Sequence, residues 1–203
     1  MNFNIIMRLN PYKSVYLAGF ITFLGYALMH FTYRSFNIWK IYPSASIKLI
    51  FRSFNISTEV IFANGSPTVG FLAFLNITGL IFLLTAFLCL WKLLSKHPFP
   101  KIFNILFVLS GVLILAHAYA SFIQSKLHYN VPFEYFTRIA LPFLCLVISL
   151  NSFSKNKKDK ILERTLPVVI AITFLAHGLY AIQFLPIPQD FLLMTTNILR
   201  TPR

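Results

Sequence analysis

Long apolar runs without charged residues alternate along the chain with short polar segments. The clearest runs cover residues 14–33, 68–91, 102–123 and 166–185. An α-helix rises about 1.5 Å per residue, so roughly 20 apolar residues cross the hydrocarbon core of a bilayer. The runs lack the period-two alternation that is typical of membrane barrel strands. The pattern therefore predicts membrane-spanning α-helices.

A weaker run at residues 131–153 carries Glu134 and Arg138 in its first turns. The stretch 139–150 behind them contains no charged residue. The two charged residues are four positions apart, so they share one helix face and partly neutralise each other. We therefore predict a further span here. The fold class is an all-α membrane protein with a bundle of about five transmembrane helices.

The composition supports a membrane protein. Of 203 residues, 57% are hydrophobic and 11% are charged, which is more apolar surface than a soluble domain of this size can bury. The net charge of +13 could indicate nucleic acid, but lysines and arginines cluster at the ends of the apolar runs. We expect the lipid bilayer as the partner and no nucleic acid. Cys89 and Cys145 fall inside predicted spans, near the same face, and we expect them to behave as small apolar residues rather than as a disulfide or a redox pair.

The distribution of basic residues predicts an orientation. Residues 1–13, the turn 92–101 and the loop 152–164 are short and rich in Lys and Arg, whereas basic residues on the opposite side are spread over longer segments. Dense positive charge in short loops marks the cytoplasmic side. We therefore expect residues 1–13 to be cytoplasmic. The high content of Phe, Ile, Asn and Lys suits an AT-rich genome, so we expect a bacterial inner membrane.

The first and last spans resemble each other. Residues 21–29 and 172–180 are identical at five of nine positions, and both helices are predicted to run in the same direction. If this is a parallel repeat, residues 14–153 form a four-span membrane unit. Residues 154–203, a basic loop, the fifth span and an interfacial tail, then open a second unit. Chance similarity between apolar helices is the alternative.

One stretch resembles a known family. The segment 174–191, with its His177-Gly-Leu-Tyr-Ala-Ile and its Pro-x-Pro, is similar to a helix of DoxX-like membrane proteins. The segment 133–142 is also similar to this family, in which a Glu stands before a helix and a Pro within it. Some members are associated with quinone-linked thiosulfate oxidation and others with membrane redox complexes. The resemblance therefore implies a redox-associated membrane subunit rather than an enzyme acting alone. Such proteins usually continue into further helices, so the resemblance implies that a chain that stops at Arg203 could be a truncated or frameshifted copy.

Polar side chains lie in the outer half of every predicted span, whereas the inner half is nearly bare. Ionisable groups are costly inside a membrane, so each is a functional-site hypothesis. Thr22, Tyr26 and His30 form a stripe on one face of the first span, and the last span carries a matching stripe. The candidate pocket residues are Tyr26, His30, Asn76, His117, Glu134, Arg138, His177 and Tyr180.

Three functions are compatible with these residues. Histidine and tyrosine could donate hydrogen bonds to the carbonyl oxygens of a quinone, with membrane redox subunits as partners and no covalently bound cofactor. His177 and Glu134 could instead relay protons in a transporter or channel component. The third alternative is a structural or assembly protein in which the polar groups only join helices. No metal site is predicted, because His-x-x-His and Glu-x-x-His pairs are absent from every span.

Overall fold

The computed structural model describes residues 10–32, 62–63, 66–95, 100–124, 130–150 and 153–181, with single residues between 52 and 59. Within these ranges, the side chains of residues 32, 62–63, 66–67, 121, 123–124, 130–134, 176–177 and 180–181 are outside the description. The described part contains five α-helices: α1 (Pro11–Thr32), α4 (Val69–Leu94), α5 (Asn104–Gln124), α6 (Asn130–Ser149) and α7 (Lys155–Ala181). A 3-10 turn, η3 (Lys101–Phe103), precedes α5. A two-stranded antiparallel ladder, β1 (Phe62–Ala63) with β2 (Ser66–Pro67), precedes α4.

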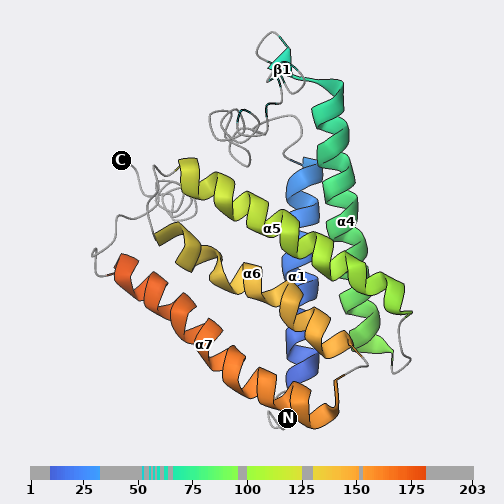
Figure 1. The fold of residues 1–203 in the computed structure, drawn as a ribbon, viewed down its shortest axis with the longest axis vertical. Helices are drawn as coiled ribbons and strands as arrows, with labels where there is room; N and C mark the ends of the chain where they lie inside the picture. Colours follow the sequence, from blue (N-terminus) through green and yellow to red (C-terminus); the bar gives the residue numbers. More distant parts are fainter. Residues whose placement is uncertain are drawn as a thin grey trace, which may run out of the picture.

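The helices form two groups that cross each other (Figure 1). Helices α1 and α4 lie side by side and run in opposite directions. Helices α5, α6 and α7 lie in a row in front of them, so that α6 contacts both of its neighbours in the row. Helix α6 also packs on α1, and α4 packs on α5. Helix α1 is therefore enclosed by the other elements along one face.

The core follows a helical stripe on α1. Its buried residues recur every three or four positions, which places them on one face of the helix. The residues of this stripe are Val15, Tyr16, Gly19, Phe23, Tyr26, Ala27 and His30. Phe23 is fully buried at the centre, with its ring 6.5 Å from that of Phe82 on α4 and 6.4 Å from that of Phe107 on α5. Aromatic packing thus joins α1, α4 and α5.

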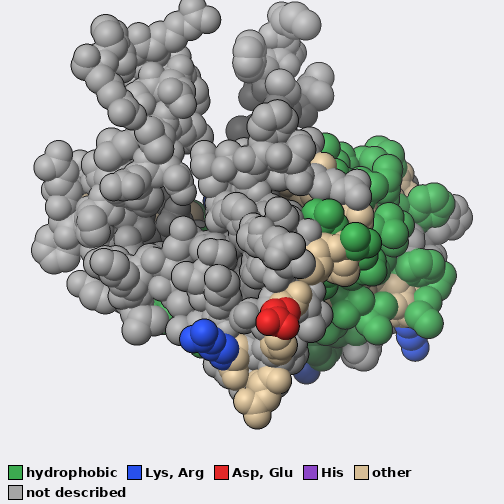
Figure 2. Space-filling model, turned by 90° about the horizontal axis from the view of Figure 1, so that it is seen from above, with side chains coloured by type: hydrophobic (Ala, Val, Ile, Leu, Met, Phe, Trp, Pro, Cys, Tyr) green, Lys and Arg blue, Asp and Glu red, His purple; other side chains and the backbone are tan. Residues whose placement is uncertain are grey.

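The outer faces of the helices are apolar as well. Ile21 on α1, Phe87 on α4 and Val112 on α5 are all more than half exposed, and Figure 2 shows hydrophobic side chains over much of the described surface. Helices that are apolar on every side are typical of a lipid environment. Three segments are long and apolar enough to cross a membrane, Pro11–Phe31, Val69–Leu94 and Lys101–Ala120. The structure is thus that of a protein suited to a bilayer.

The structure confirms helices at all five predicted places, with two corrections to their limits. The fourth helix ends at Ser149, whereas the predicted span extends to residue 153. The last helix begins at Lys155, whereas we predicted a basic loop up to residue 164 followed by a span from 166. Ser154 starts the helix, because its side-chain oxygen accepts a hydrogen bond from the backbone N–H of Lys157 at 3.4 Å. Leu162 anchors this basic portion, since its side chain is buried in the core. The predicted interfacial tail lies outside the described residues.

Candidate functional site

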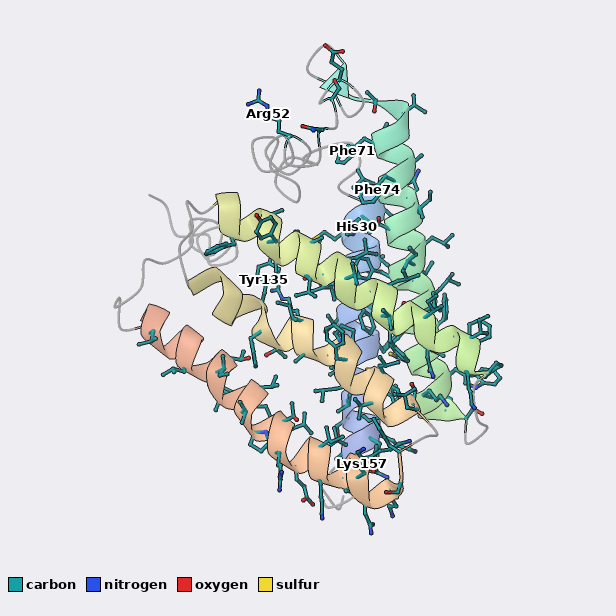
Figure 3. The ribbon with its side chains drawn as sticks, in the orientation of Figure 1. His30, Arg52, Phe71, Phe74, Tyr135 and Lys157 are labelled. Carbon is teal, nitrogen blue, oxygen red and sulfur yellow. The ribbon has the colours of Figure 1, made fainter. Side chains whose placement is uncertain are left out.

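Five side chains from three helices form a polar and aromatic cluster near the end of α1 that carries His30. Helix α1 contributes Tyr26 and His30, α5 contributes His117, and α6 contributes Tyr135 and Arg138. We call this set the outer cluster. His30 and Tyr135 are labelled in Figure 3, His30 beside the upper part of α1 and Tyr135 lower, between α5 and α6.

His30 is buried, and a hydrogen bond to its own helix orients it. Its side chain is 2% exposed, and its Nδ1 atom lies 2.7 Å from the backbone carbonyl oxygen of Tyr26, one turn earlier. A carbonyl oxygen only accepts, so Nδ1 carries the proton, and in the neutral ring Nε2 is the acceptor atom. The ring packs 5.4 Å from that of Phe82. Gly79 on α4 makes room for this contact, because a Cβ atom there would lie 3.1 Å from the Cβ atom of His30.

Tyr26 combines a packed ring with a buried hydroxyl. Its ring stacks on Phe82, with centroids 5.0 Å apart. Its hydroxyl has no hydrogen-bond partner in the described part of the chain. The Arg138 guanidinium is close enough to interact electrostatically with this hydroxyl. A buried hydroxyl that lacks a partner costs about 1–3 kcal/mol, so this position calls for a specific explanation.

His117 connects Tyr26 to α6. Its ring meets that of Tyr26 edge to face, with centroids 5.7 Å apart, and meets that of Tyr135 in the same way at 5.6 Å. The guanidinium carbon of Arg138 lies 5.0 Å from the centroid of the Tyr135 ring. The rings therefore form a continuous path from buried Tyr26 to Arg138, whose side chain is exposed. The outer cluster thus includes both the charged Arg138 side chain at the surface and the hydrogen-bonding groups of Tyr26 and His30 in the interior.

The outer cluster combines aromatic rings with hydrogen-bonding groups. Aromatic rings provide flat apolar walls, and the hydroxyl, the imidazole and the guanidinium provide hydrogen-bond donors or acceptors. In a dry environment each such hydrogen bond is stronger than it would be in water. In the described part of the chain, His, Cys, Asp and Glu side chains do not gather in groups of three or more, as a metal ion would require.

The structure brings together four of the eight predicted site residues, namely Tyr26, His30, His117 and Arg138. Asn76 is half-buried on α4, one turn from Gly79, and the ring contacts and hydrogen bonds described for the cluster do not include it. Glu134, His177 and Tyr180 lie in α6 and α7, but their side chains are outside the described residues.

The backbone of α7 shows where His177 lies along the bundle relative to Glu134. Thr137 on α6 and Thr173 on α7 hydrogen-bond through their side-chain oxygens, which fixes the alignment of the two helices. His177 follows Thr173 by one turn, and Glu134 precedes Thr137 by about one turn, so their backbones lie at similar height on facing helices. The predicted stripe on the last span, which includes His177 and Tyr180, stays a prediction, because these side chains lie outside the described residues.

Sequence reasoning missed Tyr135 and Phe82. Tyr135 is the ring between His117 and Arg138, and Phe82 packs on both Tyr26 and His30. The spacing of Tyr135 and Arg138, three positions apart on a helix, could have indicated a cation over a ring. Phe82 offers no such signal among the 23 phenylalanines of the chain.

A second set of polar contacts joins the helices at the basic end of the bundle, which is opposite to the outer cluster. The Tyr12 hydroxyl on α1 donates to the Asp159 carboxylate on α7, and the Lys158 ammonium donates to the backbone carbonyl of Ile148 on α6 at 2.7 Å. Partial burial lowers the pKa of the Lys158 ammonium below its ordinary value. These contacts join the start of α7 to α1 and α6, far from the outer cluster, so they are structural.

Comparison of the chain with known protein families, with characterised proteins and with solved structures finds no match.

Proposed function

We propose that this chain is a multi-pass membrane protein whose outer cluster binds the head group of a quinone, as a subunit of a membrane redox system. The resemblance of residues 133–142 and 174–191 to DoxX-like proteins led to this expectation, and the chemistry of the cluster supports it. In this proposal the protein supplies binding and orientation, and partner subunits supply the electron transfer.

The observation that carries the proposal is the buried Tyr26 hydroxyl, which has no hydrogen-bond partner in the described structure. A carbonyl oxygen of a quinone is an acceptor that this hydroxyl would satisfy. Phe82 and His117 border the same ring and would contact a flat ligand from the side. Exposed Arg138 marks the side from which the head group would enter.

We also propose five membrane crossings with residues 1–13 in the cytoplasm of a bacterium. Helix α6 has 20 residues and α7 has 27, lengths that reach about 30 Å or more. Helix α1 starts, α4 ends and α7 starts at the basic end, which carries Lys13, Lys92 and the lysines of 155–160. The positive-inside rule then directs this end to the cytoplasm and the outer cluster to the other leaflet.

The test is a titration of the purified chain in detergent with a short-chain ubiquinone or menaquinone analogue, followed by quenching of tryptophan fluorescence. Wild type should bind saturably. Tyr26→Phe retains the ring that stacks on Phe82 and removes the hydroxyl, so it should weaken binding roughly tenfold or more. His177→Ala, on the predicted stripe of α7, should weaken binding by a similar factor.

The control is Tyr16→Phe, which removes the hydroxyl of another buried tyrosine of α1 at the basic end. It should bind as wild type does. Circular dichroism verifies that each variant is folded. Failure of folded wild type to bind either analogue would contradict the proposal, and equal losses in Tyr26→Phe and Tyr16→Phe would place the ligand elsewhere.

A transporter or channel component remains the competing prediction. It requires His177 and Glu134 to act together, so flux in proteoliposomes that both His177→Ala and Glu134→Gln abolish would favour it over the quinone site.

A further inference from the structure

Two cysteines from different helices meet over a glycine of a third helix. Cys89 on α4 and Cys145 on α6 are fully buried and have free thiols. A Cβ atom built on Gly19 of α1 would lie 2.9 Å from the sulfur of Cys89 and 3.0 Å from that of Cys145. The two sulfur atoms are therefore no further apart than the sum of these distances, and the thiols are close enough to interact with each other.

Glycine is needed at the point where the two thiols approach. Any other residue at position 19 would insert its side chain against both sulfur atoms. The Cys145 sulfur also lies 3.9 Å from the Val15 carbonyl oxygen, a weak contact that leaves it directed at α1. The close approach is thus specific to this position in the bundle.

We propose that Cys89 and Cys145 form a reversible disulfide that joins α4 to α6 across α1. The oxidant is a lipid-soluble disulfide. One cysteine, as the thiolate, attacks that disulfide, forming a mixed disulfide and releasing one thiol. The second cysteine then attacks the protein sulfur of the mixed disulfide, closes the Cys89–Cys145 bond and releases the second thiol. Two protein thiols are oxidised, and one external disulfide is reduced to two thiols.

Electrostatics favours a disulfide over a monovalent soft metal ion at this pair. Two thiolates on a monovalent metal ion would leave a net negative charge among apolar residues, and burying an uncompensated charge is costly. A disulfide is neutral, so it suits the same surroundings. Among the described residues, a third metal ligand does not join the pair.

Because both thiols are fully buried, an oxidant reaches them only when the ends of α4 and α6 open locally. Cys89 lies five residues before Leu94, the last residue of α4, and Cys145 lies four residues before Ser149, the last of α6. The last turns of helices open most readily, and opening exposes a thiol to water, where it ionises. The inference is independent of the quinone site, which lies about two helical turns away along α1.

The experiment uses the full chain, purified in detergent in the reduced state, with 4,4′-dithiodipyridine as the lipid-soluble disulfide. Disulfide formation releases two thiopyridones per chain and leaves no adduct, so the protein mass falls by two hydrogens. Peptide mapping should then show a cross-linked peptide containing Cys89 and Cys145 that a phosphine reductant separates. Cys89→Ser and Cys145→Ser should each release one thiopyridone and retain one adduct.

Gly19→Ala provides the geometric test, because its methyl group would clash with both sulfur atoms and displace them. It should slow cross-linking at least tenfold. Gly25→Ala on the same helix is the matched control, since a Cβ atom there meets nothing within 4 Å, and it should cross-link as wild type does. Two separate adducts on folded wild type, or reaction only after unfolding in a strong detergent, would overturn the proposal. Peptide mapping of wild type decides the question even when a variant fails to fold.

Discussion

Replacing Gly79 by alanine tests whether close contact between α1 and α4 holds the outer cluster together. The new methyl group would lie 2.9 and 3.0 Å from ring atoms of Phe31 and 3.1 Å from the Cβ atom of His30. The Phe31 ring is 37% exposed and can move aside. The Cβ atom of His30 is fixed by the α1 backbone, so relief at this contact requires the two helices to separate.

The expected magnitude follows from two opposing terms. Overpacking a tight contact costs typically about 1–3 kcal/mol. Alanine gains about 1 kcal/mol over glycine inside a helix. Gly25→Ala on α1 isolates the second term, because a Cβ atom there meets nothing within 4 Å. We therefore expect Gly79→Ala to be about 1–3 kcal/mol less stable than Gly25→Ala, although both add the same methyl group.

The assay is reversible unfolding in mixed micelles with increasing sodium dodecyl sulfate, followed by circular dichroism and tyrosine fluorescence. Both variants are compared with wild type under identical lipid and detergent conditions. The reasoning would be refuted if Gly79→Ala were as stable as Gly25→Ala. That result would mean that α1 and α4 are not in close contact at this level.

Two further predictions concern polar contacts between helices. The hydroxyls of Thr85 on α4 and Ser110 on α5 are 2.8 Å apart and buried. A double-mutant cycle with Thr85→Val and Ser110→Ala should therefore give a coupling free energy of about 0.6–2 kcal/mol. Additive losses of stability would show that the hydrogen bond contributes nothing. Burial lowers the pKa of Lys158 in the folded state below its ordinary value of 10.5, so as pH rises towards 10.5 the folded chain loses this proton before the unfolded chain does. The melting temperature of wild type should therefore rise relative to that of Lys158→Met in this alkaline window. The control Lys160→Gln changes an exposed lysine of the same segment and should follow wild type. Parallel pH profiles of the melting temperature for wild type and Lys158→Met would contradict this prediction.

The position of the candidate site along the bundle was predictable, but its composition was not. Tyr26, His30, His117 and Arg138 were identified because polar side chains stand out in apolar runs and because their distances from the helix ends agree. Tyr135 and Phe82 were missed because aromatic residues are abundant in every run. Asn76 satisfied the same depth argument, yet it lies outside the contacts described for the cluster. Depth in a membrane is readable from sequence, whereas rotation about a helix axis depends on the neighbouring helices.

The amphipathic start of α7 shows another limit. Lys155, Lys157 and Lys158 form a charge run, and charge runs near apolar segments usually mark loops. Here Ser154 caps the helix, Leu162 enters the core and Lys158 reaches the end of α6, so the segment is helical. The Ser154 cap is local, but the contacts of Leu162 and Lys158 are tertiary and cannot be predicted from the pattern of charges.

The sequence by itself determined that the chain forms apolar helices suited to a bilayer and where along the chain they lie. The physical reason is that helix length and side-chain hydrophobicity are local quantities, which a run of about 20 apolar residues already specifies. Only the tertiary structure decided that Tyr26 meets His117 and that Cys89 meets Cys145 over Gly19. Such contacts depend on how the helices cross and rotate, and these are set by close packing at many positions together.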